Sequence, residues 1–451
     1  MKRLVLIIFV LVVALAVWVL RWRESSEPAV PAPGANVKWS DPDVPIRAPQ
    51  GVIRPGSRAP LASPPSARPL PPPQGPEAPQ LPSGSTQKDR IPGEYVLGFF
   101  SWQESDAFAR AAAEQGIEIL DRMALGNTLR IRTTDEALLS RLIAEVSRPS
   151  HFDYNYYVRL PPPPPMDDKR APESGYMGFG PNALTWLGVG LENADWGKGV
   201  RVAVLDTAVQ RHSALPEDVV SRFEVDGGMT AAGGGGSGHG TAVASIIVGE
   251  AAGLRGIAPA AEIVSIPVVS AEGKGDAFTL ARGVVEAVTL GASVINLSLG
   301  SYGDSEILYD AVDYALRNDV AVVASTGNDA LRGVMYPARY EGVIAVGAVD
   351  AEYQHVYFSN RGDEVDLTAP GIAVTAAGPD NQVGLFSGTS AATPFVSGAL
   401  AAVLSGNPGM SPSEAAELLI VNAEDRGAPG RDEEYGAGVL DLRRVMEQGA
   451  E

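Results

Sequence analysis

The chain has 451 residues, and its 35 Lys and Arg against 54 Asp and Glu give a net charge of −19. Hydrophobic residues make up 45% of it, an ordinary globular proportion that excludes disorder throughout the chain. Strong acidity argues against nucleic acid as a partner, and the lack of cysteine excludes disulfides, thiolate metal sites and a cysteine nucleophile.

An unbroken apolar run, Leu4 to Leu20, opens the chain between Lys2-Arg3 and Arg21-Trp22-Arg23. In a helix this run would be about 25 Å long, at the short end of a membrane span. It is longer than the roughly 7–15 apolar residues of a usual cleaved signal peptide. We therefore predict that residues 1–23 form a single-pass membrane anchor. The charges that flank the run are nearly balanced, so they do not set its orientation. The alternative is a signal sequence whose cleavage would release a secreted protein.

Residues 24–92 are rich in Pro, Ala, Ser and Gly, and 18 of the 36 prolines lie between Pro28 and Pro92. Such a composition cannot bury enough apolar surface to fold on its own. It predicts an extended, disordered linker that holds a folded domain away from the membrane.

Residues 93–160 contain alternating and helical patterns in the order βαββαβ. We predict strands over 94–100, 117–120, 128–132 and 151–158, and helices over 105–115 and 135–146, the second with Thr134 as N-cap. This order is typical of a small α+β, ferredoxin-like fold. The run Pro161 to Pro165 opens a further linker, residues 161–180, in which we expect proteolytic processing.

Residues 181–451 alternate short continuous Val/Ile/Ala runs with helical stretches, which predicts an α/β domain with a doubly wound, mostly parallel sheet. The predicted strands are 200–205, 263–268, 294–297, 320–324 and 343–346, and the predicted helices are 241–248, 277–290 and 306–317. Because sheets of this kind bind ligands beyond the carboxyl ends of their strands, polar residues at strand ends are the candidates for function.

Four such residues stand out, and each has an ordinary structural interpretation of its own. Asp206 directly follows a strand and could be a turn residue, and His239 between two glycines could be a buried or surface histidine. Ser390, before an apolar helix, could simply be its N-cap, with Pro394 in the first turn. Asn328 follows Gly327 beyond a strand, where turn residues are common.

Taken together, the stretches around these residues resemble the subtilisin-like serine proteases (subtilases) over roughly residues 180–447, and the order Asp, His, Ser is the subtilisin order. The motifs that carry the resemblance are Asp206-Thr207, Gly238-His239-Gly240-Thr241, Asn328, and Gly388-Thr389-Ser390 with Thr393-Pro394, joined by Gly256-Ile257-Ala258-Pro259, Asn296-Leu297-Ser298-Leu299-Gly300 and Ala369-Pro370-Gly371. By the same resemblance, residues 93–160 are similar to the inhibitory propeptide of this family.

The resemblance implies a serine endopeptidase that is made as an exported or membrane-tethered, extracytoplasmic zymogen and acts on peptides or proteins. His239 would take the proton from Ser390 Oγ, Asp206 would hold the imidazole, and Asn328 with the Ser390 N–H would stabilise the oxyanion. Two segments would wall the primary specificity pocket and a third would offer its backbone to the substrate upstream. These are Ser298-Leu299-Gly300, Ser325-Thr326-Gly327 and Gly273-Lys274-Gly275.

The resemblance also places Met335, just before Tyr336-Pro337, at the floor of the primary pocket. A thioether there would shorten the pocket and keep it apolar, so we expect Leu, Met or Ala rather than an aromatic residue before the scissile bond. Asp329 would lie at the rim of the pocket, too exposed to bind a basic side chain strongly.

Several positions depart from the family pattern. Ala208 replaces a glycine and Ala391 replaces a methionine, and both substitutes are small enough to leave activity intact. Ala214 stands where many relatives have a calcium-ligating Asp, and the loop Gly249 to Arg255 lacks the expected Asn ligands. We therefore expect that no cofactor is required and that the structural calcium site is absent.

Two other functions remain compatible with these motifs. A subtilase fold that has lost activity could serve as a binding module, although the complete set of four residues argues against this. An esterase or amidase could use the same Asp, His and Ser. Labelling by a serine-directed fluorophosphonate would distinguish an active enzyme from an inactive binding module. Competing peptide and ester substrates would distinguish a peptidase from an esterase or amidase.

Overall fold

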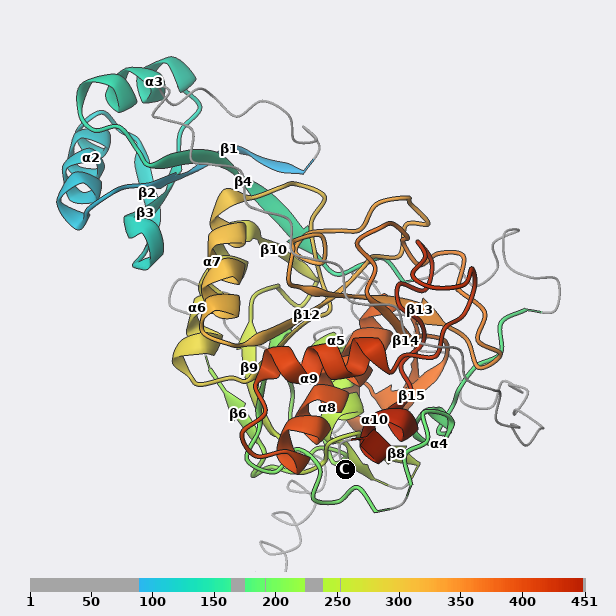
Figure 1. Cartoon of the computed structure of the whole chain (residues 1–451). Coiled ribbons are helices and arrows are strands. Elements are labelled where there is room, and N and C mark those ends of the chain that lie inside the picture. Colours follow the sequence, from blue (N-terminus) through green and yellow to red (C-terminus); the bar gives the residue numbers. More distant parts are fainter. Residues whose placement is uncertain (1–88, 164–174, 191, 224–237, 252, 449–451) are drawn as a thin grey trace, which may run out of the picture. The chain divides into compact units, whose positions relative to one another are not determined.

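The computed structural model describes residues 89–163, 175–190, 192–223, 238–251 and 253–448 (Figure 1). The predicted anchor, nearly all of the predicted Pro-rich linker and much of the predicted processing region at 161–180 lie outside these residues. The described chain forms a small α+β unit over residues 90–159, which we call the plait, and an α/β domain after residue 174.

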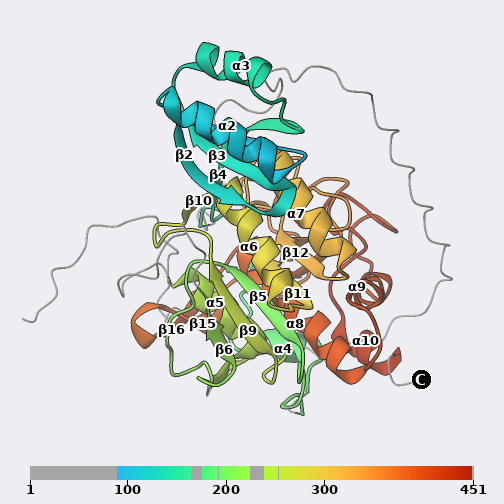
Figure 2. The ribbon, with the colours of Figure 1, turned by 90° about the vertical axis from the view of Figure 1, so that its left-hand side faces the viewer.

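The plait is an antiparallel sheet with two helices on one face (Figure 2). Its strands lie in the order β4-β1-β3-β2, and Phe99, Phe108 and Leu142 are buried between the sheet and the helices. Its elements are β1 (Arg90–Gly98), α2 (Trp102–Glu114), β2 (Glu118–Met123), β3 (Thr128–Arg132), α3 (Glu136–Glu145) and β4 (His151–Arg159), with the short turn η1 (Leu125–Asn127) before β3.

Two details of the plait differ from the sequence predictions. The N-cap of α3 is Asp135 and not Thr134: its carboxylate accepts a hydrogen bond from Leu138 N at 2.8 Å. Two residues with capping side chains stand next to each other here, and local sequence alone does not choose between them. Strand β1 also begins at Arg90, before Pro92-Gly93, and not after this pair as predicted. The pairing with β4 does not end at Pro92-Gly93 but continues with a shift of register between Arg90 and Tyr95.

The α/β domain is built on a seven-stranded sheet in the order β14-β13-β12-β11-β5-β9-β6, in which every neighbouring pair is parallel. The predicted fold class is thus confirmed. The strands are β5 (Arg201–Asp206), β6 (Val220–Arg222), β9 (Glu262–Pro267), β11 (Val294–Leu297), β12 (Ala321–Ser325), β13 (Ile344–Val349) and β14 (Leu367–Pro370). Shorter elements are α4 (Ala183–Trp186), β7 (Glu250–Ala251), β8 (Leu254–Arg255), β10 (Lys274–Asp276), β15 (Val374–Ala377), η2 (Pro379–Asn381), β16 (Val383–Phe386), α9 (Pro412–Val421) and α10 (Leu442–Gln448).

Helices cover both faces of this sheet (Figures 1 and 2). Successive residues of a strand point to opposite faces. In β5, Val202 and Val204 accordingly pack in one core with α5 (His239–Val248) and α8 (Thr389–Gly406). Ala203 and Leu205 pack in a second core with α6 (Ala277–Thr289) and α7 (Glu306–Arg317). A strand buried on both faces explains why its sequence is continuously apolar.

Helix α8 crosses the centre of the domain. Among the residues that the structure describes, it is the one helix whose length and apolar composition would allow a membrane crossing, but 83% of it is buried inside the protein. It is therefore a core helix. The helix begins at Thr389, so Pro394 lies in its interior and not in its first turn, contrary to the sequence prediction.

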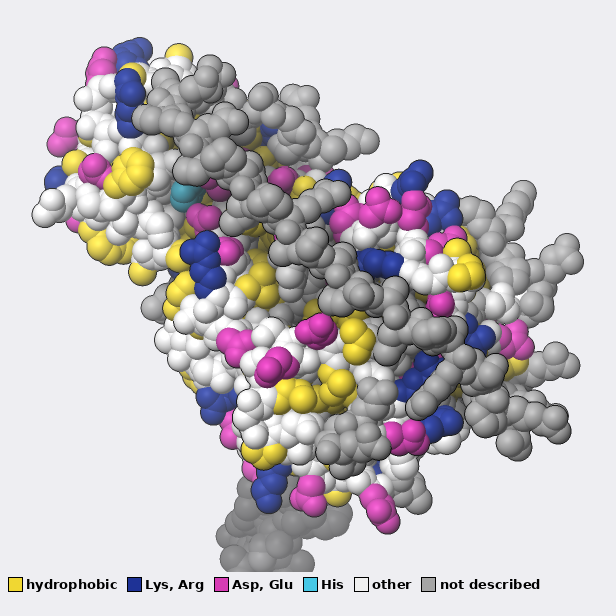
Figure 3. Space-filling model, viewed as in Figure 1, with side chains coloured by type: hydrophobic (Ala, Val, Ile, Leu, Met, Phe, Trp, Pro, Cys, Tyr) yellow, Lys and Arg dark blue, Asp and Glu magenta, His cyan; other side chains and the backbone are white. Residues whose placement is uncertain are grey.

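Charged side chains are distributed over the surface. Acidic and basic side chains lie among one another on the face shown in Figure 3, over the residues described. Several form ion pairs on the α/β domain, such as Arg361 Nη1 with Glu434 Oε1 at 3.0 Å and Arg339 Nε with Glu364 Oε1 at 3.1 Å. Such exposed pairs contribute little to stability.

Candidate active site

Asp206 and His239 meet at the carboxyl edge of the sheet. Asp206 is the last residue of β5, and His239 is the first residue of α5, which follows Gly238 in a left-handed conformation with φ of 68°. The start of α5 approaches the end of β5 closely: a Cβ added at Gly240 would lie 2.2 Å from the Thr207 carbonyl oxygen. Only glycine therefore permits this approach.

The two side chains form a buried hydrogen-bonded pair. His239 Nδ1 lies 2.8 Å from Asp206 Oδ1 and 2.9 Å from Oδ2, and the two residues are 2% and 0% exposed. Asp206 Oδ1 also accepts a hydrogen bond from Thr207 N at 2.7 Å. A buried carboxylate on Nδ1 fixes the ring orientation and the tautomer, so that Nε2 is the nitrogen available as a base.

Ser390 is the second residue of α8, and the N-cap of this helix is Gly388. The alternative role of Ser390 as an N-cap is therefore excluded. Its Oγ donates to the Ser298 carbonyl at 3.1 Å. Because Pro394 has no N–H, the Ser390 carbonyl lacks its usual helical donor, and it accepts instead from Ser298 Oγ at 3.2 Å. The helix is thereby joined to the segment after β11.

Asn328 lies in the loop after β12, beside the start of α8. Its Oδ1 accepts from Thr389 N at 3.0 Å and from Thr389 Oγ1 at 2.9 Å. Its Nδ2 donates to the Pro162 carbonyl at 3.0 Å. A Cβ at Gly388, where φ is 128°, would lie 2.7 Å from this Nδ2. The Asn328 side-chain amide is thus held through its oxygen, while its nitrogen donates to a peptide carbonyl.

Asn360, which the sequence analysis did not single out, holds the loop that carries Asn328. It is fully buried, and its Oδ1 accepts from Asp329 N at 3.1 Å and from Leu331 N at 3.0 Å. Its Nδ2 donates to the Thr326 carbonyl at 3.0 Å, and its backbone N–H donates to the Gly327 carbonyl. Nothing in the local sequence distinguishes Asn360 from an ordinary turn residue.

An extended segment of the chain itself lies beside these residues. This segment, residues 157–163, is called the tail and comprises the end of β4 and the residues directly after it. Strand β10 pairs antiparallel with β4, with Gly275 opposite Val158, and Leu160 N donates to the Gly273 carbonyl at 3.1 Å. On the other side, Arg159 and Gly300 exchange two backbone hydrogen bonds of 2.9 and 3.0 Å. The predicted substrate-binding backbone at 273–275 and 298–300 thus flanks one extended peptide.

Met335 lies between the two predicted pocket walls. A Cβ at Gly300 would meet Met335 Cε at 2.6 Å, and a Cβ at Gly327 would meet its Sδ at 2.9 Å. Met335 is 2% exposed, and its N–H donates to the Thr326 carbonyl at 3.1 Å. Ser298, Leu299, Ser325 and Thr326 are buried as well. The thioether therefore fills space between the segments 298–300 and 325–327.

Asp329 is exposed next to Asn328, and its Oδ2 accepts a hydrogen bond of 2.6 Å from the Tyr302 hydroxyl. Asn360 Nδ2 in turn donates to that hydroxyl at 2.8 Å. Burial, together with the hydrogen bond to Asp329, raises the pKa of Tyr302 well above its usual range. The Asp329 carboxylate is thus already engaged by a neighbour.

Ala214, which stands where many relatives have a calcium-ligating Asp, lies in apolar surroundings. Ala214 packs against Leu254 and Ala377 in a small apolar cluster. Its carbonyl accepts a hydrogen bond from Glu250 N at 2.8 Å, and β7 pairs with β8 across the loop. Calcium prefers six to eight oxygen ligands, which an apolar cluster cannot provide.

Comparison with known proteins gives concordant matches. A family model described as "Subtilase family" matches residues 197–438. Subtilisin BL of Lederbergia lenta is 37% identical over 251 residues, which are 54% of this chain and 89% of that protein. Minor extracellular protease Epr of Bacillus subtilis is 34% identical over 255 residues, 55% of this chain and 38% of that protein.

Among solved structures, fervidolysin from Fervidobacterium pennivorans, described as a keratinolytic enzyme related to subtilisin, has a similar fold. The TM-score is 0.65 with 24% sequence identity, and the match covers 80% of this chain and 62% of that chain. This coverage exceeds the share of the chain that lies after residue 174. The similarity of fold therefore includes residues before the α/β domain.

Proposed function

Because this chain belongs to the subtilase family and is a subtilisin-like serine endopeptidase, we propose that Asp206, His239 and Ser390 form its catalytic triad, with Asn328 in the oxyanion hole. The observation that carries this proposal is the buried hydrogen bond between His239 Nδ1 and Asp206, at the carboxyl edge of the sheet. This is the arrangement that a general-base histidine requires.

In the proposed mechanism, His239 removes the proton from Ser390 Oγ as the oxygen attacks the substrate carbonyl carbon. Asp206 keeps the imidazole in one tautomer and stabilises the imidazolium that forms. The negative charge on the substrate oxygen is stabilised by Asn328 Nδ2 and by the N–H of Ser390 at the start of α8. His239 then protonates the leaving amine, and water hydrolyses the acyl-enzyme.

The proposed substrate is an extended peptide that pairs with Gly273, Lys274 and Gly275 on one side and with segment 298–300 on the other. The pairing of the tail with both edges supports this, since added strands bind through backbone hydrogen bonds. Met335 between Gly300 and Gly327 supports a short apolar primary pocket that prefers Leu, Met or Ala. The hydrogen bond from Tyr302 to Asp329 argues against selection of Lys or Arg at this position.

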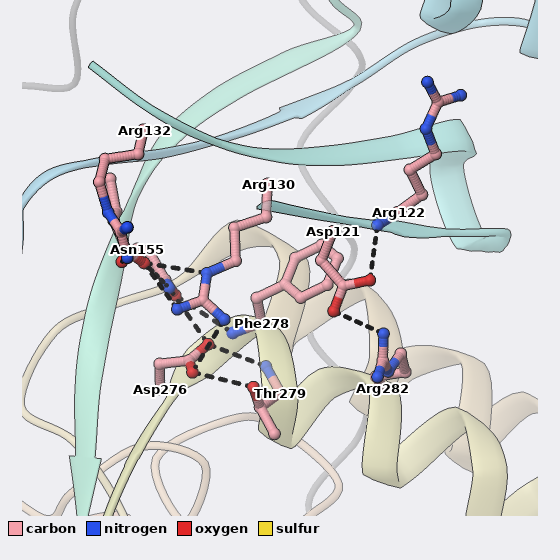
Figure 4. A network of polar contacts seen from close by, with 10 residues as sticks. Asp121, Arg122, Arg130, Arg132, Asn155, Asp276, Phe278, Thr279 and Arg282 are labelled. Atoms are coloured by element: carbon pink, nitrogen blue, oxygen red, sulfur yellow. Dashed lines mark hydrogen bonds and ion pairs between the residues drawn. The ribbon is translucent and has the colours of Figure 1, made fainter. Parts of the chain in front are cut away.

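We further propose that the plait is the propeptide of a zymogen and inhibits the α/β domain within the same chain. Besides the tail, a polar network supports this role (Figure 4). Arg130 of β3 contacts Asp276 Oδ2 at 3.2 Å, and Asn155 Oδ1 accepts from Phe278 N at 3.2 Å near the start of α6. Arg282 of α6 donates to Asp121 of β2 at 2.6 Å.

The proposed location is extracytoplasmic, with residues 1–23 as a single-pass anchor, or secreted after cleavage of this segment. The apolar run Leu4 to Leu20 supports it, as does similarity to a protease described as extracellular. An intact mass and N-terminal sequence of the protein purified from its native host would decide between the two. A mature N-terminus before residue 4, with the chain in the cytosol, would contradict both.

We also propose that folding of the α/β domain does not need calcium at Ala214, since that residue lies in an apolar cluster. A chelator should then leave the thermal unfolding midpoint unchanged. A clear fall in the midpoint that added calcium reverses would refute this proposal.

The proposed mechanism is tested with Ser390→Ala and Asn328→Ala in the full chain, using peptide hydrolysis and fluorophosphonate labelling. Ser390→Ala should abolish both. Asn328→Ala should lower kcat by about 10²–10³, a magnitude taken from the corresponding change in a subtilisin. Near-normal peptidase activity of Ser390→Ala would rule out the mechanism. A wild-type protein that hydrolyses esters but no peptide would favour the esterase alternative.

A further inference from the structure

The tail presents an unusual sequence to the proposed nucleophile. Its first residues are ordinary, but Pro161 to Pro165 are five consecutive prolines, of which 161–163 are described. The role of this proline run in the cleft depends on the peptidase function proposed above.

The strand register, continued by two residues, would place Pro161 opposite Ser298. Arg159 and Gly300 form a hydrogen-bonded antiparallel pair, and such pairs recur at every second residue. The next hydrogen-bonded pair would join residue 161 to Ser298. Proline has no N–H to donate, and the Ser298 carbonyl accepts instead from Ser390 Oγ at 3.1 Å. An ordinary residue at position 161 would compete with the serine for this acceptor.

The carbonyl held by Asn328 belongs to the next residue. Asn328 Nδ2 donates to the Pro162 oxygen at 3.0 Å, while Asn328 Oδ1 is bonded to Thr389, the neighbour of Ser390. The peptide bonds beside the proposed nucleophile are therefore 161–162 and 162–163. Each of them joins one proline to another, whichever of the two carbonyls Ser390 would attack.

Hydrolysis of such a bond meets a specific obstacle. The Ser390 Oγ–carbon bond must form, the carbon–nitrogen bond must break, and the serine proton must reach the leaving nitrogen through His239. The nitrogen of a proline residue carries a ring carbon where other residues carry hydrogen, and the ring fixes φ near −65°. The ring carbon crowds the side from which the imidazolium must protonate this nitrogen. The proline ring also restricts the backbone conformation of the residue that precedes it.

We propose that the proline run makes the tail an occupant of the cleft that the enzyme cannot hydrolyse at the point of contact. The plait then stays covalently attached until a bond elsewhere is cut. Until then, peptide substrates reach Ser390 only when the plait and tail dissociate as a unit. The tail is in this respect an inhibitory peptide that belongs to the chain itself. Its upstream residues pair as an extended strand, and its prolines prevent hydrolysis.

The test replaces two prolines in the full-length protein. Pro162→Ala/Pro163→Ala changes two exposed residues and leaves the buried Pro161 in place. It converts the peptide bonds 161–162 and 162–163 to ordinary secondary amides. The matched control is Pro71→Ala/Pro72→Ala, which removes two adjacent prolines from another proline run. Each protein is also made with Ser390→Ala. Intact mass is followed over time, and thermal unfolding midpoints establish that the variants fold.

The expected result is a new cleavage after residue 161 or 162 in Pro162→Ala/Pro163→Ala alone, with complete loss of this fragment when Ser390→Ala is added. The same cleavage in the wild type or in the control would overturn the proposal. So would a folded Pro162→Ala/Pro163→Ala protein that stays uncut there but hydrolyses an added peptide, and in that case the proposed function survives. Absence of Ser390-dependent hydrolysis of any peptide in all variants would overturn the proposed function together with this inference.

Discussion

Removal of the Arg130 side chain should activate the intact chain. Arg130 is 16% exposed and lies in the network of Figure 4, where its guanidinium contacts Glu94 Oε2 at 2.7 Å within the plait and Asp276 Oδ2 at 3.2 Å across to the α/β domain. Asp276 is also the N-cap of α6 and accepts from Thr279 N at 3.0 Å. Arg130→Ala removes this ion pair with Asp276, whereas Asn155 Nδ2 keeps its hydrogen bond to Asp276 Oδ1 at 3.1 Å.

The size of the effect depends on the partners that each carboxylate keeps. Loss of one partner of a buried ion pair can cost about 3–5 kcal/mol when the other charge is left alone. Here Glu94 keeps Arg132 at 2.8 Å and Asn155 at 2.9 Å, and Asp276 keeps Thr279. Burial alone would raise the pKa of the Glu94 carboxyl, but the bonds from Asn155, Arg132 and Arg130 lower it overall. The loss across the contact is therefore that of one charged hydrogen bond, about 2 kcal/mol.

A change of about 2 kcal/mol is about a 30-fold change in an equilibrium constant. While most molecules hold the tail in the cleft, hydrolysis of an added peptide is proportional to the open fraction. Arg130→Ala should thus raise the peptidase rate of the uncut chain by up to about 30-fold, with intact mass used to verify that the chain is uncut. The matched control is Arg122→Ala, since Arg122 forms an exposed ion pair with Asp106 inside the plait.

Two outcomes would refute this reasoning. One is an uncut Arg130→Ala protein with the basal rate of the wild type. The other is an Arg122→Ala protein activated to the same extent, which would mean that general loosening of the plait, and not the contact with Asp276, controls the cleft.

Three single side chains allow further tests. Met335→Gly should raise kcat/KM for Phe relative to Leu before the scissile bond, by about 1–3 kcal/mol of discrimination, and a peptide-library profile that does not move, or one dominated by Arg or Lys, would count against the pocket assignment. Asn360→Ala should lower kcat with little change in KM, by no more than Asn328→Ala does, because Asn360 acts by positioning the loop of Asn328; an equal loss in kcat and rise in KM would indicate a merely structural role. Burial lowers the pKa of His151 to about 4, whereas an unfolded histidine titrates near about 6.5. The neutral form is thus favoured in the fold, and stability that is present above about pH 6.5 is lost as the pH falls toward 4, by about 3 kcal/mol at most. His151→Phe should remove this acid sensitivity of the thermal midpoint, and an unchanged pH dependence would contradict it.

The architecture could be predicted from the sequence because its signals are local. Strands β5 and β12 of the α/β domain are largely continuous apolar runs, and such runs arise where both faces of a strand are covered by helices. Helix α7 has the predicted bounds, Glu306–Arg317, since its apolar residues recur at helical spacing. The end of β5 brings Asp206 to the sheet edge in the same way. The residue at the end of a strand can therefore be predicted from the sequence, whereas the residues that it contacts cannot.

Contacts between distant segments were beyond the sequence. The pairing of Arg159 with Gly300 and the bonds of Asn360 depend on how segments far apart in the chain come together, and no periodicity encodes them. The N-cap of α3 and the start of α8 were missed for a smaller reason, since helix ends depend on one or two hydrogen bonds. Within the tail, residues 161–163 were predicted only as part of a linker, because a proline run has no apolar periodicity.

The proposed substrate cleft would recognise the backbone of a peptide. The edges at 273–276 and 298–300 bind the tail through main-chain N–H and C=O groups, which every extended peptide offers. Recognition of this kind cannot by itself separate an inhibitor from a substrate. In this chain, the proposed inhibitor and a substrate would differ at the nitrogen beside the carbonyl that Ser390 attacks: in the tail it belongs to a proline ring, whereas in most substrates it carries a hydrogen. A protease that binds backbone can therefore carry an inhibitory segment with the upstream contacts of a substrate, provided that the bond at Ser390 resists cleavage.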